Sequence, residues 1–448
     1  ELLGDMIEVP ADNIIIYGNS SLNVMYDTIS RSMTHGVMGN TPWCKLDKVK
    51  FLCPVPGYDR HFAITEYFGI EMVNVPMTEE GPDMDIVEEL VSKDESIKGI
   101  WCVPKYSNPT GNSYSDQTVR RFARLKPAAA DFRIYWDNAY SVHHLYDDDQ
   151  DNLIEILAEC KRAGNPDLAY KFSSTSKISF PGSGIAAVAT SHNNLEDIKK
   201  QLRMQTIGHD KVNQLRHVRY FKNIHGMVEH MRKHAEILRP KFEAVEAILE
   251  RELGGLGIGS WTSPKGGYFI SFDSMDGCAK DIVAKCKKAG VVMTGAGATY
   301  PYGKDPHDSN IRIGGFVSYS RRKTGKKLII RWEKQMQEII DRYGDSETQY
   351  LLPIIEREDG TERRQYRNKM LLVNRKLKKI AARAGLTKPL TMYVARHSWA
   401  SIAKTKNISI GIISEAMGHD SETTTQIYLS SIQTNQIDNA NRNILKDL

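Results

Sequence analysis

Lys177 closes a run of small hydroxyl residues, Ser173-Ser-Thr-Ser176, and is followed by a turn at Pro181-Gly182. A lysine amine attacks a carbonyl group only when it is deprotonated. A lysine among neighbours that lower its pKa, or one already linked to a cofactor aldehyde, is therefore a common covalent catalyst. The plain alternative is a solvated serine-rich loop with one surface lysine, and the loop by itself favours that alternative.

Polar groups suited to chemistry also follow the preceding strands. Three expected strands are each followed by such a group: Asn108 after residues 99–103, Asp137 and Tyr140 after residues 132–136, and Lys177 after residues 170–172. Taken singly, Asn108 fits a β-turn and Asp137 fits a helix cap. In this order along one sheet they predict a common site, because ligands bind at the carboxyl ends of parallel strands.

The elements around these groups alternate between strand and helix, which predicts an α/β fold with a mainly parallel sheet. Further strands are expected at residues 13–17, 49–53 and 71–75, and an apolar helical face runs through residues 22–33. Asn19 and Ser20 lie where the first strand turns into that helix. The helix N-terminus could cradle a phosphate, or it could be an ordinary capped turn.

The composition is that of a folded, multidomain protein: 448 residues, 41% of them apolar and 26% charged. The six cysteines show neither CxxC nor Cys/His metal spacing, so we expect a reducing compartment and no metal site. Without a long apolar run or a signal-peptide layout, a soluble cytoplasmic protein without a membrane partner is predicted. Because the chain begins at Glu1, just before a strand, an N-terminal segment is expected to be missing.

Three motifs, Asn108-Pro-Thr-Gly, Asp137-x-Ala-Tyr140 and Ser174-x-Ser-Lys177, resemble those of class I/II aminotransferases of fold type I. The atypical aspartate aminotransferase branch is the most similar. The resemblance implies a large cofactor-binding domain (residues 1–215, truncated at its N-terminus) and a small α+β domain (216–313, truncated at its C-terminus). It also implies pyridoxal 5′-phosphate as cofactor, an acidic amino acid and a 2-oxo acid as substrates, and a homodimer.

The same resemblance assigns roles to the polar groups. Lys177 would carry the cofactor and move a proton at the substrate carbon, while Asp137 would pair with the protonated pyridine nitrogen. Asn108 and Tyr140 would hydrogen-bond the ring 3-oxygen. The remaining cofactor contacts would be Asn19, Ser20, Ser174 and Ser176 on the phosphate and Tyr58 on the ring face.

Substrate recognition falls to Arg312, in Ser309-Asn-Ile-Arg-Ile313. By resemblance it would clamp the substrate α-carboxylate through two parallel N–H···O bonds, whereas a solvated arginine at a strand end is the alternative. A Gly266-Gly267 pair, within a strand expected at residues 261–272, would let the backbone approach the substrate. The family's phosphate-binding arginine after the lysine is absent from Pro181-Gly-Ser-Gly-Ile185, which we take as a subgroup trait.

The charge changes sign along the chain. Residues 314–448 carry 24 Lys and Arg against 14 Asp and Glu, a net charge of +10. The preceding residues carry 36 against 41, a net charge of −5. A basic hairpin is expected across residues 316–332, followed by helices. This balance predicts an acidic enzyme body joined to a basic domain of the kind that binds nucleic acid.

The basic part, about residues 316–448, resembles the catalytic C-terminal half of a tyrosine recombinase of the phage integrase family. The resemblance rests on Ala395-Arg-His, Met417-Gly-His-Asp420 and a tyrosine nine residues after His419. It implies a mostly helical fold, with Tyr428 as nucleophile on a DNA phosphodiester. Arg396 and His419 would stabilise the phosphorane, and Lys323 would protonate the leaving 5′-oxygen.

Two departures from the recombinase pattern stand out. Tyr393 occupies the family's His/Lys position, and the family's first catalytic arginine belongs to a segment that aminotransferase-like sequence replaces here. Loss of one such group typically costs about 10²–10³ in rate, which argues against strand exchange. We therefore predict a chimera, arising as a natural gene fusion, an integration scar or an assembly artefact. Its leading function is transamination; DNA recombination and two inactive halves are the alternatives.

Overall fold

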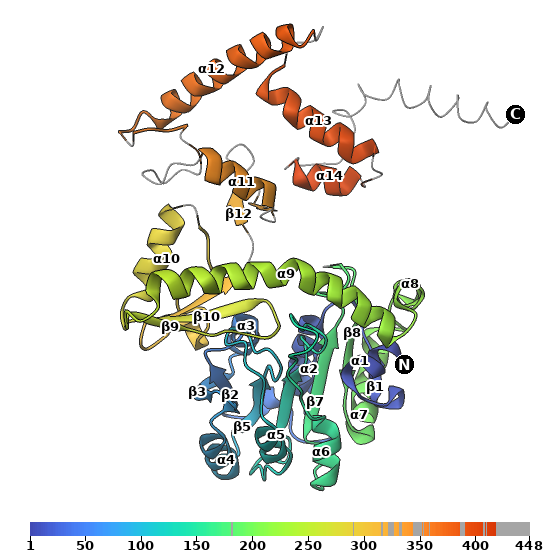
Figure 1. Cartoon of the computed structure of the whole chain (residues 1–448). Helices are drawn as coiled ribbons and strands as arrows, with labels where there is room; N and C mark the ends of the chain where they lie inside the picture. The colour runs from blue at the N-terminus through green and yellow to red at the C-terminus, as the bar shows by residue number, and fades with distance from the viewer. Residues whose placement is uncertain are drawn as a thin grey trace, which may run out of the picture. The chain divides into compact units, whose positions relative to one another are not determined.

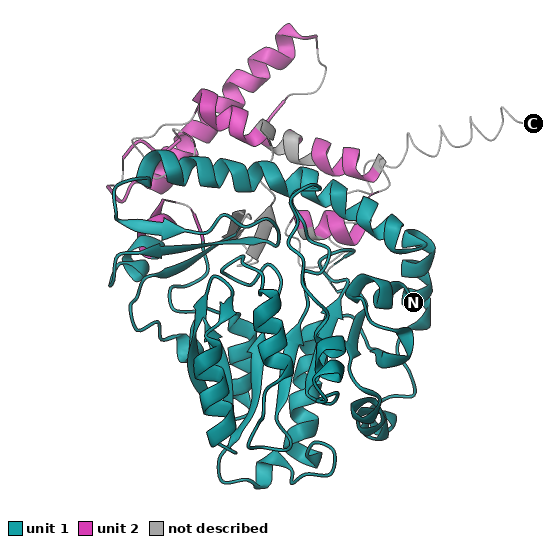
Figure 2. Ribbon diagram, turned by 60° about the horizontal axis from the view of Figure 1, so that its bottom comes forward, with its two compact units in different colours: residues 1–283, 293–315 teal, residues 284–292, 316–448 magenta. Residues whose placement is uncertain are grey.

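The computed structural model describes all residues except 181, 290, 315, 316, 321–326, 331–333, 344–351, 353, 358, 386–389, 406, 407, 409 and 418–448 (Figure 1). The chain divides into two compact units (Figure 2). The first consists of residues 1–283 and 293–315, and the second of residues 284–292 and 316–448.

The first unit is built on an eight-stranded sheet of order β1-β8-β7-β6-β5-β2-β3-β4. Its five central strands run parallel: β2 (Lys50–Val55), β3 (Glu71–Thr78), β5 (Ile97–Cys102), β6 (Arg133–Asp137) and β7 (Ala169–Ser174). Three short strands join antiparallel: β1 (Ile14–Ile16), β4 (Gly81–Pro82) and β8 (Ala186–Ala189). The mainly parallel sheet expected from the alternation of strands and helices is therefore present.

Helices cover both faces of this sheet, because successive residues of a strand point to opposite sides. Tyr135 packs in the core formed with α2 (Ser21–His35), α3 (Asp59–Tyr67) and α7 (His192–Gln205). Its neighbours Ile134 and Trp136 pack in the opposite core. The helices of that second core are α4 (Met84–Lys93), α5 (Asp116–Ala123) and α6 (Ile156–Arg162).

The rest of the first unit contains a second, antiparallel sheet of order β11-β10-β9. Its strands are β9 (Gly259–Trp261), β10 (Phe269–Ser274) and β11 (Asn310–Gly314). The other helices of the first unit are α1 (Leu2–Ile7), α8 (Lys211–Phe221) and the long α9 (Ile224–Leu253), and the division between the two units falls within α10 (Ala279–Lys288). Short 3₁₀ turns occur at Ala11–Asn13, Trp43–Lys45 and Pro301–Gly303. None of the helices in the described ranges is long and apolar enough to cross a membrane.

The single strand expected at residues 261–272 is wrong, because β9 ends at Trp261 and β10 begins only at Phe269. The intervening backbone turns against the loop that follows β6. A Cβ atom on Gly266 would lie 2.3 Å from the Tyr106 ring and 2.5 Å from the carbonyl oxygen of His143. Gly267 has φ +79°, which a residue with a side chain rarely adopts. These glycines thus allow close packing within the chain.

In the second unit the expected hairpin is present, with β12 (Val317–Ser320) pairing antiparallel to β13 (Lys327–Ile330). Its helices are α11 (Lys334–Tyr343), α12 (Glu362–Arg383), α13 (Met392–Thr405) and α14 (Ile410–Ala416). A small apolar cluster, formed by Ala400, Ala403, Ile413 and Met417, joins α13 and α14.

Candidate active site

The predicted site residues lie where the parallel strands of the first unit end. Tyr58 follows β2, Asn108 follows β5, and Lys177 follows β7. Asp137 is the last residue of β6 itself, because the strand ends one residue later than expected. The structure brings Lys177 next to Tyr140, with the amine Nζ 4.8 Å from the centroid of the phenol ring.

Asp137 carries the clearest sign of a missing partner. Its carboxylate is almost fully buried at 3% exposure, and its Oδ2 lies 3.0 Å from Nε2 of His61. The other oxygen, Oδ1, is buried without a hydrogen-bond partner. A buried carboxylate oxygen left unpaired is costly, so this atom fits a ligand that brings a positively charged N–H group. The protonated nitrogen of a pyridine ring is such a group.

His61, which the motifs did not single out, holds this carboxylate. The imidazole is 1% exposed and stacks on Trp101, with ring centroids 4.4 Å apart and planes 12° from parallel. Tyr58 meets the same imidazole edge-on, at 4.9 Å between centroids. The only sequence signal was a histidine three residues after Tyr58 in the first turn of an expected helix, which is too common to predict a site.

Two phenol groups at the site stay protonated at neutral pH. Burial raises the pKa of Tyr140 well above its ordinary value, and the negative charge of Asp137 acts in the same direction. Burial also raises the pKa of Tyr58 to about 12, against the opposing charge of Lys177. A protonated phenol can donate a hydrogen bond, so Tyr140 suits an anionic oxygen.

Three of the residues predicted to bind the phosphate, Asn19, Ser20 and Ser176, lie at the N-terminus of α2. Ser20 is the N-cap residue of this 15-residue helix, and its side chain makes no capping hydrogen bond. The hydroxyl of Ser176 donates to the Asn19 carbonyl (2.6 Å), and Asn19 Nδ2 donates to the Gly182 carbonyl (2.8 Å). Ser174 ends β7 and is buried. The Lys177 loop is thus tied to the helix end that could hold an anion.

Arg312, on β11, is held by three acceptors. Its Nη1 donates to Asp59 Oδ1 (2.8 Å) and to Asn108 Oδ1 (3.1 Å). Its Nη2 donates to Thr294 Oγ1 (3.1 Å), whereas its Nε is buried without a partner. Asp59 and Thr294 were not predicted. Asp59 lies 253 residues before Arg312, so no local pattern could have pointed to this contact.

His143 is a further site residue that the motifs missed. Both its ring nitrogens are buried without hydrogen-bond partners, and the ring meets Tyr140 and Tyr268 edge-on, each at 5.5 Å. Tyr268 in turn donates to the carbonyl of Lys177 (3.1 Å). Burial holds the pKa of His143 well below its ordinary value, and the charge of Lys177 lowers it further. A neutral imidazole therefore lies beside the lysine loop.

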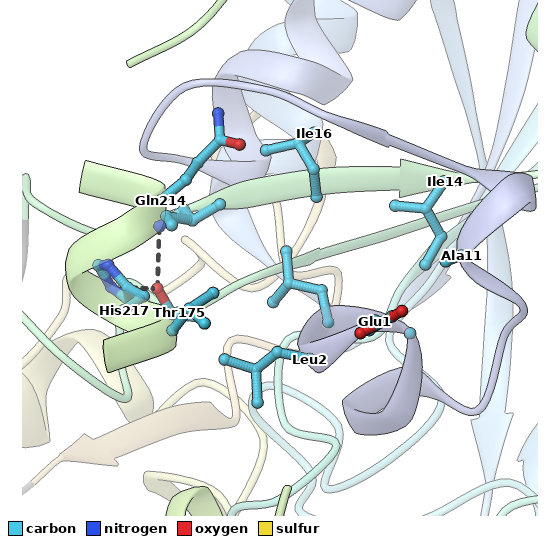
Figure 3. A pocket seen from close by; sticks show the side chains of 12 residues that line it. Glu1, Leu2, Ala11, Ile14, Ile16, Thr175, Gln214 and His217 are labelled. Atoms are coloured by element: carbon cyan, nitrogen blue, oxygen red, sulfur yellow. Dashed lines mark hydrogen bonds between the residues drawn. The ribbon is translucent and has the colours of Figure 1, made fainter. Parts of the chain in front are cut away.

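His217, on α8, also contacts the lysine loop. Its Nδ1 lies 2.9 Å from the Asn213 carbonyl, so Nδ1 carries the proton. Nε2 then accepts from the Thr175 hydroxyl (3.1 Å) and lies 2.9 Å from the hydroxyl of Ser179, which donates to the Thr175 carbonyl. Thr175 and Ser179 flank Lys177 in sequence. His217 and Thr175 line a mostly apolar cavity of about 200 Å³ beside α1 and β1 (Figure 3). None of the predicted site residues lines this cavity.

The structure describes no side-chain contacts for the four predicted recombinase residues. Lys323, His419 and Tyr428 lie outside the described residues, and Arg396 lies in α13 without a described side chain. The site that the structure defines therefore belongs entirely to the first unit.

The fold and this site define a pyridoxal-phosphate-dependent transaminase, and comparison with known proteins agrees. Residues 1–319 match the family described as aspartate amino-transferase. An aspartate aminotransferase of Corynebacterium glutamicum is 46% identical over 314 residues, 70% of this chain and 72% of the relative. An aminotransferase of Mycolicibacterium smegmatis is 49% identical over 313 residues, 70% of this chain and 73% of the relative. The chain belongs to the aspartate aminotransferase family.

Solved structures and a second family match complete the comparison. The crystal structure of an aspartate transaminase from Corynebacterium glutamicum matches with a TM-score of 0.68 and 45% identity, over 70% of this chain and 74% of that one. An α-aminoadipate aminotransferase from Thermus thermophilus, complexed with N-(5′-phosphopyridoxyl)-L-leucine, shares the fold at 20% identity (TM-score 0.58, over 70% of this chain and 74% of that one). Residues 306–434 match the phage integrase family. Both predicted resemblances are thus confirmed, and pyridoxal phosphate is the cofactor.

Proposed function

We propose that the first unit transfers the amino group of an acidic amino acid to a 2-oxo acid, using pyridoxal phosphate bound at Lys177. The observation that carries this proposal is the buried, unpartnered Oδ1 of Asp137 at the strand ends. Pyridoxal phosphate supplies an aldehyde for amines and a ring that withdraws electrons from the substrate α-carbon. Oδ1 of Asp137 would pair with the ring nitrogen, while His61 keeps the carboxylate in place through Oδ2.

The other site residues would bind the aldehyde carbon, the 3-oxygen and the face of the cofactor ring. The Lys177 amine holds the cofactor aldehyde and then moves a proton at the substrate α-carbon. Because Oδ1 of Asn108 accepts a hydrogen bond from Arg312, Nδ2 is the group that would donate to the ring 3-oxygen, together with the protonated phenol of Tyr140. Tyr58 packs on the ring face. Together these groups hold the ring so that the proton moves between fixed positions.

The cofactor phosphate would bind at the N-terminus of α2, with hydrogen bonds from Asn19, Ser20, Ser174 and Ser176. A hollow of about 360 Å³ beside Asn19 is also lined by Arg216 of α8. Its guanidinium reaches the Ser183 carbonyl (3.4 Å) and the Asn213 side chain (2.6 Å). Arg216 thus offers a cation near a loop whose sequence lacks the family arginine, and a phosphate favours such a cation.

An acidic amino donor is supported by the name of the Corynebacterium glutamicum relative, an aspartate aminotransferase. Arg312 would take the α-carboxylate, which every amino acid has. The specificity is tested by comparing kcat/KM for aspartate with that for leucine, each with 2-oxoglutarate as acceptor, and by measuring kcat/KM for glutamate with oxaloacetate as acceptor. A preference for leucine would contradict an acidic substrate and leave transamination itself intact.

We also propose that the chain has three domains, at residues 1–215, 216–313 and 314–448. We propose further that it forms a homodimer. Exposed apolar side chains in the lysine loop, at the end of α7, in the segment after it and on α8 support a partner surface: Phe180, Met204, Ile207, Val212, Leu215, Val218 and Tyr220. Exposed apolar surface of this extent marks an interface more often than a free face. Sedimentation equilibrium of the full chain tests it, and a monomer at all concentrations would contradict the dimer.

The experiment that tests the cofactor site is an absorbance spectrum of the purified chain saturated with pyridoxal phosphate. We expect a band near the visible edge that borohydride bleaches and that Lys177→Ala abolishes. Lys211→Ala, which removes an exposed lysine from the start of α8, is the matched control and should keep the band. A saturated wild-type protein without this band would refute the assignment of Lys177.

For residues 314–448 we propose binding of duplex DNA, because of their net charge of +10 and the match to the phage integrase family. Tyr428, Arg396, His419 and Lys323 would form the recombinase set. We expect salt-sensitive retention of duplex by the full chain, since released counterions make phosphate contacts salt-dependent. A suicide DNA substrate tests chemistry: a covalent complex that Tyr428→Phe prevents would show strand cleavage. Duplex binding that ignores salt would contradict the proposal.

A further inference from the structure

We propose that Asp59 is an internal carboxylate that occupies Arg312 between turnovers and is displaced by the α-carboxylate of the incoming amino acid. The inference rests on the proposed transaminase function and adds a positioning residue to it. Asp59 Oδ1 lies 2.8 Å from Arg312 Nη1, the distance of a charge-assisted hydrogen bond. The ion pair therefore uses an N–H group that the substrate carboxylate needs.

The guanidinium requires such a partner when no substrate is bound. Arg312 is 9% exposed, and its Nε is buried without a hydrogen-bond partner. A nearly buried cation without a counter-charge is strongly unfavourable. Its two other acceptors, Asn108 and Thr294, are uncharged. Asp59 thus supplies the negative charge that a substrate would bring.

Of the two partners, Arg312 is the one held in place. Its strand pairs with β10 at Ser271, two neutral acceptors fix its guanidinium, and the Phe269 ring lies 4.9 Å from its central carbon. The Asp59 side chain is 30% exposed. Within the described part of the chain, its side chain makes one hydrogen bond, the one with Arg312. An incoming carboxylate would therefore move Asp59 and leave the arginine where it is.

The position of Asp59 lowers the free-energy cost of moving its carboxylate away from Arg312. It is the first residue of α3, whose N-terminus carries free backbone N–H groups and the positive end of the helix dipole. A carboxylate released from Arg312 is still stabilised there and can turn to water. The exchange keeps one negative charge on Arg312 throughout, and the substrate must compete for the N–H groups that Asp59 holds.

Removing the charge of Asp59 should therefore tighten substrate binding. In the holoenzyme, Asp59→Asn is expected to lower KM for the amino donor about fivefold, with kcat unchanged or slightly lower. Maleate, a dicarboxylate without an amino group, should bind about fivefold tighter when titrated against the cofactor spectrum. Asp59→Ala is a second variant with the same expected direction, which guards against an effect peculiar to asparagine.

Asp85→Asn is the matched control. Asp85 also lies in the first turn of a helix, α4, and also pairs with an arginine, Arg121, but on the surface away from the predicted site residues. It should leave KM and maleate affinity unchanged. A merely structural role for Asp59 would lower thermal stability or kcat without lowering KM.

An unchanged or raised KM in both Asp59 variants, with a wild-type enzyme that transaminates, would overturn this inference alone. A wild-type protein that binds the cofactor but transfers no amino group would instead overturn the proposed function, and this inference with it. A drop in KM with matching gains in maleate affinity supports Asp59 as the displaced carboxylate.

Discussion

Nε2 of His61 lies 3.0 Å from Oδ2 of Asp137, while the second oxygen of the same carboxylate is buried without a partner. One oxygen is thus fixed by the protein and the other is directed at whatever occupies the site. The imidazole cannot turn away, because it is buried and stacked on Trp101. This arrangement holds the carboxylate charge where a pyridine nitrogen would need it.

Replacement of Asp137 tests that reading most directly. Asp137→Asn removes the charge but keeps the shape, so we expect kcat for transamination to fall by about 10²–10³, the usual cost of losing one preorganised electrostatic group. His61→Phe should keep the stack on Trp101 and cost about tenfold, since it loosens the carboxylate without removing it. Single-turnover rates measure both. A larger loss for His61→Phe than for Asp137→Asn would contradict the assignment.

Tyr140→Phe removes one donor proposed for the ring 3-oxygen. A donor to that oxygen favours its anionic form, and one hydrogen bond to a charged group is worth about 1.5–3 kcal/mol. We therefore expect the apparent pKa of the lysine–cofactor absorbance band to rise by about one unit, because 1.36 kcal/mol corresponds to one pKa unit. A pH titration of the spectrum measures it. Tyr106→Phe, a buried phenol that contacts His144, is the control and should leave that pKa unchanged.

The stability of the first unit should depend on pH through His144. Burial, followed by the nearby charge of Lys105, lowers the pKa of His144 to about 4. An unfolded chain takes up this proton near pH 6.5, so between these values the unfolded state binds more protons than the native state. Stability therefore decreases as the pH falls from about 6.5 to about 4.

His144→Gln should reduce this pH dependence, because glutamine takes up no proton in either state. Denaturant midpoints at pH 7 and pH 5 measure the effect, and the variant should show the smaller difference. His35→Gln, an exposed position at the end of α2, is the control. An equal difference between the pH 7 and pH 5 midpoints in the wild type and in His144→Gln would contradict the prediction.

Gly266→Ala should destabilise the first unit. The added Cβ would meet the Tyr106 ring at 2.3 Å and the His143 carbonyl at 2.5 Å, so packed backbone or ring atoms must shift. Overpacking of this kind costs about 1–3 kcal/mol, which lowers the denaturation midpoint. Gly208→Ala is the matched control, since no atom lies within 4 Å of its added Cβ. A neutral Gly266→Ala would show that the loop relaxes freely.

The sequence predicted most of the parallel sheet, because buried strands are continuous apolar runs that end in polar residues. β2, β5, β6 and β7 appear within three residues of the expected limits. The strand expected at residues 261–272 failed because its middle turns against Tyr106, a contact that no local pattern encodes. Side chains at strand ends were predictable for a similar reason: parallel topology alone brings them to one edge.

The sequence by itself also determined the two families, through motifs of short spacing such as Asp137-x-Ala-Tyr140 and Ala395-Arg-His397. Only the tertiary structure decided how the site residues are held. His61 meets Asp137 across 76 residues, and Asp59 meets Arg312 across 253. Such pairs depend on how loops from different strands pack together. The residue types made a cofactor site predictable, whereas the partners that position its charges followed only from the fold.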